Sequence, residues 1–420
     1  MAREASQTAA SEWRRNWPVV LAAAAGSALS AVVPYSTGIF IQPLEGEFGW
    51  SRASISAAMA IFATVGVFFS PVFGALLDRV GVRRMGLTGS LIFCAALASL
   101  SLAGPSIWSW WALWILVSFA ALTIKSTIWS AAVSAVFRAS RGLALGIVLC
   151  GTGIAASVVP MLTNMLIASV GWRGAYLGLG MIFAAVVTPL LFLFLHDAGG
   201  RRSRMAGQGG AADGRADLPG WTARTGFRRR QLYQLAAVGG FAAAIITAYT
   251  VHFVPILTGA GIDRAQAVQI VTLSGLMSMV ARLASGLALD HLPARAVGGF
   301  SLILPILPAL IFLCLPMTPA LAIVAACLIG ICAGAEHDVV IYLATRYFGM
   351  RNFWTLFGVV SSGILGGVGA GPFLAGYVYD RTGGYDLLHW AMIPAAILCS
   401  LLVATLGRYP DHDSAIPAGS

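Results

Sequence analysis

The chain has 420 residues, of which 58% are hydrophobic and only 10% charged, and its formal net charge is +10. A soluble domain usually carries about 25% charged residues. These proportions exclude a water-soluble globular protein, and they equally exclude an intrinsically disordered chain. The composition is instead typical of a membrane protein with many spans.

Apolar runs that are long enough to cross a bilayer, about 20 residues each, recur twelve times. They lie near residues 18–43, 53–77, 85–104, 107–136, 142–168, 174–195, 231–257, 265–289, 296–316, 319–345, 353–379 and 386–407. The only long polar stretch, His196 to Arg230, divides these runs into six and six. We therefore predict an all-α membrane protein with an N-terminal six-helix half (1–196), a cytoplasmic linker (197–230) and a C-terminal six-helix half (231–420).

The positive charges predict the orientation of these spans. With a cytoplasmic N-terminus, 20 of the 26 basic residues fall on the cytoplasmic side, four fall on the other side and two lie within spans. Basic residues concentrate in cytoplasmic loops, so we expect both termini and the linker in the cytoplasm. The expected location is the plasma membrane, which is the inner membrane in a bacterium, and the basic charge then needs no nucleic acid as partner.

An internal repeat relates the two halves at a separation of 212 residues. The matched positions are Pro43 and Pro255, Gly49 and Gly261, Arg52 and Arg264, Gly74 and Gly286, Asp78 and Asp290, Gly146 and Gly358, Gly151 and Gly363, Pro160 and Pro372, and Gly171 and Gly383. A parallel repeat of two six-span halves is typical of secondary transporters, whose substrate site lies near the midplane between the halves.

The stretch from Gly74 to Arg84, GALLDRVGVRR, lies between the second and third predicted spans. It resembles the G-x-x-x-D-R-x-G-R-R loop of the major facilitator superfamily. A glycine at position 81 suits a tight turn with positive φ. The resemblance implies the major facilitator fold and a cytoplasmic latch formed by Gly74, Asp78, Arg79, Gly81, Arg83 and Arg84. The equivalent stretch of the second half, Gly286 to Asp290, is not followed by the Arg and Gly of this motif.

A narrower resemblance points to bacterial members of the monocarboxylate porter branch. It is carried by Pro34–Phe40, Glu47–Arg52, Arg282–Gly286, Gly334–Asp338 and Arg346–Gly349. The resemblance implies transport of small monocarboxylates. The chain departs from the branch at two positions, because Tyr35 stands where animal members have lysine, and Ser278 stands where the branch has an aspartate. If a proton is carried, another group must therefore carry it.

Two basic residues lie inside predicted spans, where a charge is costly and usually functional. Arg282, in the eighth span, is the first candidate for binding a substrate carboxylate, because its planar guanidinium matches a carboxylate with two donors. Lys125, the only lysine of the chain, is the second candidate, in the fourth span. The alternative for Arg282 is a structural ion pair with Glu336 or Asp338, and for Lys125 an ion pair between packed helices.

Three ionisable residues follow one another in the tenth span. Asp338 and Glu336 are candidate proton carriers, since burial and neighbouring charge both shift the protonation of a carboxyl group; the alternative is charge balance without titration. His337 is a third candidate because histidine titrates near neutrality, although a core histidine is the alternative. Successive helical residues point about 100° apart, so the three cannot all face one cavity.

Further polar side chains fall on spans that line the cavity in the superfamily. They are Tyr35, Tyr249, His252 and Tyr342, and Asn164 in the fifth span is a further polar candidate. Each is a candidate for contacting substrate, with plain packing as the alternative. The tryptophans Trp108, Trp110, Trp111 and Trp114 are expected in the belt at the membrane surface.

The sequence thus predicts a transporter and no enzyme, with small organic anions and protons as partners, in the lipid bilayer, acting as a monomer. Symport of monocarboxylates with protons by alternating access is the leading hypothesis. A dicarboxylate or anion exchanger, a drug–proton antiporter and a transporter-like ligand sensor are alternatives. The six cysteines lack metal-ligand spacing and no G-x-x-x-x-G-K-[ST] loop occurs, so we expect no metal and no cofactor.

Overall fold

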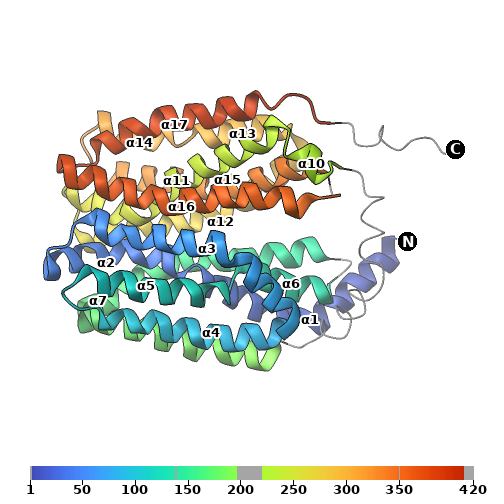
Figure 1. The fold of residues 1–420 in the computed structure, drawn as a ribbon, viewed down its shortest axis with the longest axis horizontal. Coiled ribbons are helices and arrows are strands. Elements are labelled where there is room, and N and C mark those ends of the chain that lie inside the picture. Colours follow the sequence, from blue (N-terminus) through green and yellow to red (C-terminus); the bar gives the residue numbers. More distant parts are fainter. Residues whose placement is uncertain (1, 138–139, 196–219, 350, 411–420) are drawn as a thin grey trace. The chain divides into compact units, whose positions relative to one another are not determined.

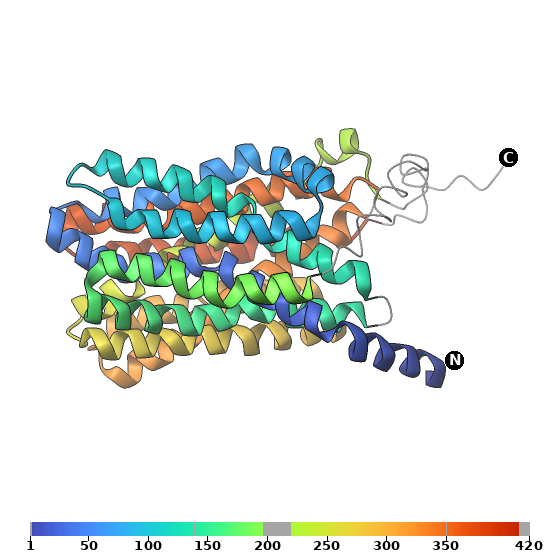
Figure 2. The same ribbon diagram turned by 90° about the horizontal axis from the view of Figure 1, so that it is seen from below.

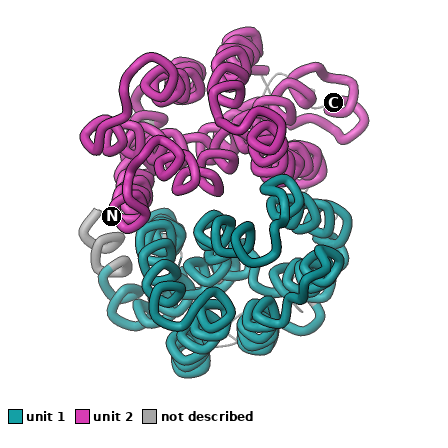
Figure 3. The backbone as a smooth tube through the Cα atoms, turned by 90° about the vertical axis from the view of Figure 1, so that its left-hand side faces the viewer, with its two compact units in different colours: residues 1–205 teal, residues 206–420 magenta. Residues whose placement is uncertain are grey.

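The computed structural model describes residues 2–137, 140–195, 220–349 and 351–410, with the side chains of these ranges except residues 2–9, 78, 135, 141 and 290. The chain forms two compact units, residues 1–205 and 206–420 (Figure 3). Of the predicted linker, residues 197–219 lie outside the described ranges.

The described elements are helical throughout, apart from one isolated bridge between Gly220 and Gly349. Within a bilayer the helix is the structure that lets one apolar segment pair all its own backbone groups. In unit 1 the helices are α1 (Ala2–Ser30), α2 (Val32–Phe48), α3 (Arg52–Val80), α4 (Val82–Ser99), the 3-10 turn η1 (Leu100–Leu102), α5 (Ile107–Leu122), α6 (Ser126–Val136) and α7 (Arg141–Phe194). In unit 2 they are α10 (Ala223–Gly226), α11 (Arg230–Gly259), α12 (Arg264–His291), α13 (Ala294–Ile303), α14 (Ile306–Cys314), α15 (Pro319–Phe348), α16 (Phe353–Thr382) and α17 (Asp386–Ala404), as Figure 1 shows.

Helix α7 contains two spans rather than one. Its 54 residues would extend about 81 Å as a straight helix, far more than the roughly 30 Å of a hydrocarbon core. The helix breaks at Gly171, whose φ of 71° and ψ of 173° are not helical, and its two segments run side by side (Figures 1 and 2). The described residues contain 11 apolar helical segments long enough to span a membrane, and dividing α7 at Gly171 yields the twelve predicted spans.

The backbone reproduces the predicted repeat. Gly171 and its counterpart Gly383 have φ values of 71° and 72°, in the left-handed region that favours glycine. Gly49 and Gly261 likewise have φ values of 66° and 88°. The serine and aspartate that follow them by two positions, Ser51 and Asp263, both cap the next helix through their side chains.

The closest helix packing is also repeated. A Cβ atom on Gly151 would lie 2.1 Å from the carbonyl oxygen of Ala24, so α7 and α1 meet without space for a side chain. In unit 2, a Cβ atom on Gly363 would lie 2.4 Å from the carbonyl oxygen of Ala236, between α16 and α11. Each residue of the first pair precedes its counterpart by 212 positions. Small residues permit such close approach of membrane helices.

The fourth span differs from the prediction of a continuous helix over 107–136. It consists of α5 and α6, and Lys125 lies in the break between them with φ −53° and ψ 147°. The indole of Trp129 donates to the carbonyl of Ile124 at 2.9 Å, which compensates a carbonyl that the break deprives of its helical partner. The break is therefore a packed and hydrogen-bonded feature of the fold.

The four tryptophans of the same span do not form one belt. Trp108 is 71% exposed, as a belt residue would be, but Trp110 and Trp114 are 0% and 1% exposed. The indole of Trp110 donates to the carbonyl of Ile55 at 3.3 Å and that of Trp111 to the carbonyl of Ser54 at 3.0 Å. The expectation of a belt was thus wrong for Trp110 and Trp114, because both side chains are buried in the core of unit 1.

In unit 2, the end of the predicted linker joins the folded core. Trp221 is buried and its backbone N–H donates to the carbonyl of Phe348 at 2.8 Å. Its neighbours in this core include Tyr347 and Phe348 on α15 and Leu356 on α16. The chain from Gly220 onward therefore belongs to unit 2.

Candidate functional site

Lys125 is held by a neutral hydroxyl group within unit 1. Its ammonium donates to the Ser70 hydroxyl at 2.5 Å, and that hydroxyl in turn donates to the carbonyl of Gly66. Ser70 lies on α3 next to Pro71, which interrupts the hydrogen bonding of that helix. Lys125 thus lies half-buried at the break in the fourth span, close to Pro71 in the second span.

Arg282 forms an ion pair within unit 2. Its Nη1 donates to Oδ1 of Asp338 at 2.8 Å, which joins α12 to α15. The side chains of Arg282 and Asp338 are 21% and 23% exposed. The pair is therefore neither sealed in the core nor on an open surface. A guanidinium has five donors, and this contact uses one of them.

The two ionisable residues that directly precede Asp338, Glu336 and His337, lie on other sides of α15. The Glu336 side chain is buried, with a relative exposure of 8%, and it lines a small cavity inside unit 2. The His337 side chain is exposed. The three consecutive residues thus occupy three different environments, as helical geometry requires.

Tyr249 and His252 on α11 are both fully buried. The Tyr249 hydroxyl is 3.1 Å from Nδ1 of His389 on α17. Nε2 of His252 is 2.9 Å from the Pro372 carbonyl oxygen, which only accepts, so this nitrogen carries a proton; Nδ1 is 2.9 Å from the Tyr385 hydroxyl. These contacts join α11 to α16 and α17 and leave the two candidate side chains no exposed surface.

The remaining polar candidates are partly exposed on three helices. Tyr35 lies on α2, Asn164 on the first segment of α7 and Tyr342 on α15. Tyr342 also packs against the core of unit 2 that contains Tyr347 and Phe348. Each position is compatible with either of the predicted roles.

The stretch from Gly74 to Arg84 forms the end of α3, the turn at Gly81 and the start of α4. Gly81 has a φ of 88°, which agrees with the turn expected there. Arg83 donates to the carbonyl of Phe192 at the end of α7, at 3.3 Å, while Gly74, Arg79 and Arg84 are exposed. The side chain of Asp78 lies outside the described part of the chain, so the expected latch is described only in its basic and glycine residues.

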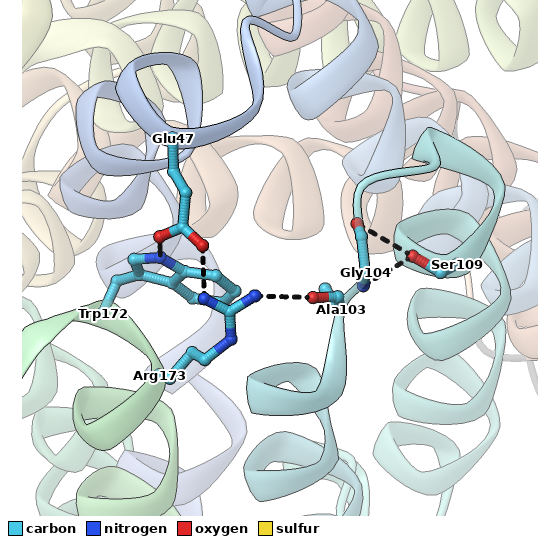
Figure 4. Close-up of polar contacts among 6 residues, drawn as sticks. All are labelled: Glu47, Ala103, Gly104, Ser109, Trp172 and Arg173. Atoms are coloured by element: carbon cyan, nitrogen blue, oxygen red, sulfur yellow. Dashed lines mark hydrogen bonds and ion pairs between the residues drawn. The ribbon is translucent and has the colours of Figure 1, made fainter.

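A polar cluster joins the end of α2, the turn at Gly171 within α7 and the turn before α5 (Figure 4). The Glu47 carboxylate, at the end of α2, accepts from the Trp172 indole and from the Arg173 guanidinium. Arg173 also donates to the carbonyl of Ala103 at 3.1 Å, so the turn at Gly171 is tied to the turn before α5. The repeat indicated a special position at Gly171, but no sequence pattern indicated the partners of Glu47.

Two units of six spans each, with ionisable residues held inside the spans, define a polytopic membrane transporter and no enzyme. The chain belongs to the Major Facilitator Superfamily, whose family model matches residues 20–353 and 236–420. It is similar to monocarboxylate transporter 13 of Rattus norvegicus, with 27% identity over 88% of this chain and 83% of the relative. Monocarboxylate transporter 13 of Bos taurus matches at 27% identity over 88% of this chain and 84% of the relative.

Solved structures show the same fold at low identity. The nucleoside transporter NupG matches with a TM-score of 0.73 and 13% identity, over 93% of this chain and 100% of that chain. The D-xylose-proton symporter matches with a TM-score of 0.72 and 12% identity, over 94% of this chain and 98% of that chain. The prediction of a major facilitator fold that resembles the monocarboxylate branch is confirmed.

Ser70 is the residue of this site that sequence reasoning missed. A serine within an apolar run carries no signal of its own, and no Gly or Pro marks the break at residues 123–125. The one available signal was the repeat, because Ser70 precedes Arg282 by 212 residues.

Proposed function

We propose that the protein carries small organic anions, in the first place monocarboxylates, across the membrane together with protons. The observation that supports this most strongly is Arg282, a partly exposed guanidinium inside a membrane span that uses one donor on Asp338. The other donors suit a substrate carboxylate bound by two parallel hydrogen bonds. The relatives named monocarboxylate transporters support the choice of substrate class.

Lys125 is the second proposed anion-binding residue. Its ammonium contacts a neutral hydroxyl, and hydrogen bonds between two charged groups are stronger than those to a neutral acceptor. A substrate carboxylate would therefore be a stronger acceptor for Lys125 than the Ser70 hydroxyl is. Two such cations also favour a second candidate function, the transport or exchange of dicarboxylates.

We propose that the protein is a monomer in the plasma membrane, which is the inner membrane in a bacterium, and that both termini lie in the cytoplasm. The excess of basic residues in the segments joined to the termini and around the linker supports this orientation. The two halves, 1–196 and 231–420, then alternate access around the substrate, and the loop from Gly74 to Arg84 acts as a cytoplasmic latch.

The test is uptake of a labelled monocarboxylate such as lactate by proteoliposomes that contain the purified protein. An acidic outside is expected to accelerate uptake. Arg282→Ala should lower uptake about 10–100-fold, the equivalent of losing about 1.5–3 kcal/mol of charged hydrogen bonding. Uptake by Arg282→Lys should lie between that of the unchanged protein and that of Arg282→Ala, since a lysine keeps the charge but loses the two-donor geometry.

Arg381→Ala is the matched control, because Arg381 is an exposed arginine of the same unit. Unchanged uptake by Arg282→Ala would exclude the proposed role of this residue. Competition by a four-carbon dicarboxylate stronger than by lactate would favour the second candidate. Proton-driven efflux of organic cations would favour an antiporter, and tight binding of a carboxylate without flux would favour a sensor.

A further inference from the structure

The interior of unit 2 holds a carboxyl group away from the Arg282–Asp338 pair. On helix α15, Glu336 precedes Asp338 by two residues, which places the two side chains about 160° apart around the helix axis. Asp338 is bound to Arg282 at 2.8 Å, whereas the Glu336 side chain is buried in the opposite direction. The two carboxyl groups therefore cannot have the same task.

Glu336 lines a cavity that has room for about one water molecule. The lining residues are Ala242, Ile245 and Ile246 from α11, Ser301 and Leu302 from α13, Pro305, Cys332 and Glu336 from α15, and Cys399 from α17. The carboxyl group, two thiols and one hydroxyl are the polar groups of a lining that is otherwise apolar.

Among the described residues, those that line the cavity together with Glu336 carry no positive charge. Helix α11 contributes only apolar side chains to the cavity, α13 contributes the Ser301 hydroxyl, and α15 and α17 contribute the thiols of Cys332 and Cys399. The Ser301 hydroxyl donates to the carbonyl of Gly298 at 3.2 Å, and Cys399 lies 3.9 Å from the carbonyl of Val238. The charges that act on Glu336 from farther away, Arg282 and Asp338, have opposite signs.

An ionised carboxylate in this cavity would be buried without a counter-ion, which costs several kcal/mol in a membrane interior. A neutral carboxylic acid avoids that cost. The position thus suits a group that binds a proton in one stage of a cycle and gives it up when its surroundings change. Asp338 differs from Glu336, because a guanidinium at 2.8 Å stabilises its ionised form.

We propose that Glu336 and its cavity form the proton-binding site of the transport cycle, and that Asp338 serves as the counter-ion of Arg282 while substrate is absent. The carboxylate of Glu336 takes a proton from a hydronium ion in the cavity, leaving a carboxylic acid and a water molecule. This assignment rests on the proposed proton symport, and it separates the roles of two acids that the sequence left equivalent.

Glu336→Gln tests the assignment, because glutamine imitates the neutral acid. In proteoliposomes, the variant should lose accumulation driven by a proton gradient at least about tenfold, while exchange of internal for external substrate falls much less. Its uptake should also lose its dependence on pH. Asp338→Asn should keep the pH dependence and change the substrate concentration for half-maximal uptake. Asp386→Asn, at an exposed carboxyl of the same unit, is the control.

An infrared measurement tests Glu336 without any transport assay. The protonated carboxyl band of the purified protein should contain a component that is absent from Glu336→Gln and present in Asp338→Asn. Proton-driven accumulation by Glu336→Gln with the pH dependence of the unchanged protein would overturn the proposal, and so would an infrared band unaffected by this substitution. Failure of the unchanged protein to take up any carboxylate would instead refute the proposed function, while the infrared result still decides the state of Glu336.

Discussion

Ser70 and Arg282 occupy the same place in the two halves of the protein. They are 212 residues apart, and each joins the second span of its half to the fourth, Ser70 by its contact with Lys125 and Arg282 by its contact with Asp338. In unit 1 the cation stands on the fourth span and the acceptor on the second, and in unit 2 these positions are exchanged. Each half thus holds one cation in an equivalent polar contact.

The first prediction concerns the contact between Ser70 and Lys125. Ser70→Ala should lower the free energy of unfolding by about 1–3 kcal/mol, because the partly buried ammonium loses its acceptor. The combination with Lys125→Met should cost less than the sum of the two single substitutions. Thermal unfolding in detergent measures all three variants. Strictly additive shifts in Tm would show that the contact contributes nothing.

The second prediction concerns Arg282 and Asp338. Removing the arginine alone, as in Arg282→Gln, should destabilise by more than the roughly 1 kcal/mol of a surface pair and less than the about 3–5 kcal/mol of a fully buried one. The additional substitution Asp338→Asn should restore much of the Tm, since it removes the unpaired carboxylate. Transport should remain lost in the double variant, which separates stability from function. Recovery of uptake in that variant would contradict the prediction.

The third prediction compares charge with packing in the cluster around Glu47. The side chains of Arg173 and Glu47 are 46% and 39% exposed, so Glu47→Gln should cost less than about 1 kcal/mol, and less still at high salt. Trp172 is 6% exposed, and Trp172→Ala should cost about 3–5 kcal/mol. Unfolding at low and high salt checks both values. A larger effect of Glu47→Gln would reverse this ranking.

The fourth prediction uses the repeated close contacts. Gly151→Ala and Gly363→Ala should both lower Tm markedly, because each new methyl group would meet a backbone carbonyl of the neighbouring helix at less than a van der Waals distance. Gly146→Ala and Gly358→Ala are matched controls, since a Cβ at either position meets nothing within 4 Å. Equal tolerance of all four substitutions would show that neither contact is tight.

The spans could be predicted because long apolar runs indicate them in the sequence, and the repeat could be predicted from the spacing of prolines and glycines. The repeated positive φ values at Gly49 and Gly261 followed from residue type and spacing alone. The break before Lys125 could not be predicted, because it depends on Trp129 supplying a hydrogen bond and on Gly86 and Gly26 leaving space for its ring. Helical geometry separated Glu336 from Asp338, but only the packing of neighbouring helices shows which of them meets Arg282.

The two glycine contacts separate what the halves share from what they do not. The contact of Gly151 with Ala24 is repeated by that of Gly363 with Ala236. At the polar positions the halves differ, because Ser70 corresponds to Arg282 and Lys125 to His337. The two halves therefore have the same close helix packing at this place but a different distribution of charge inside their spans.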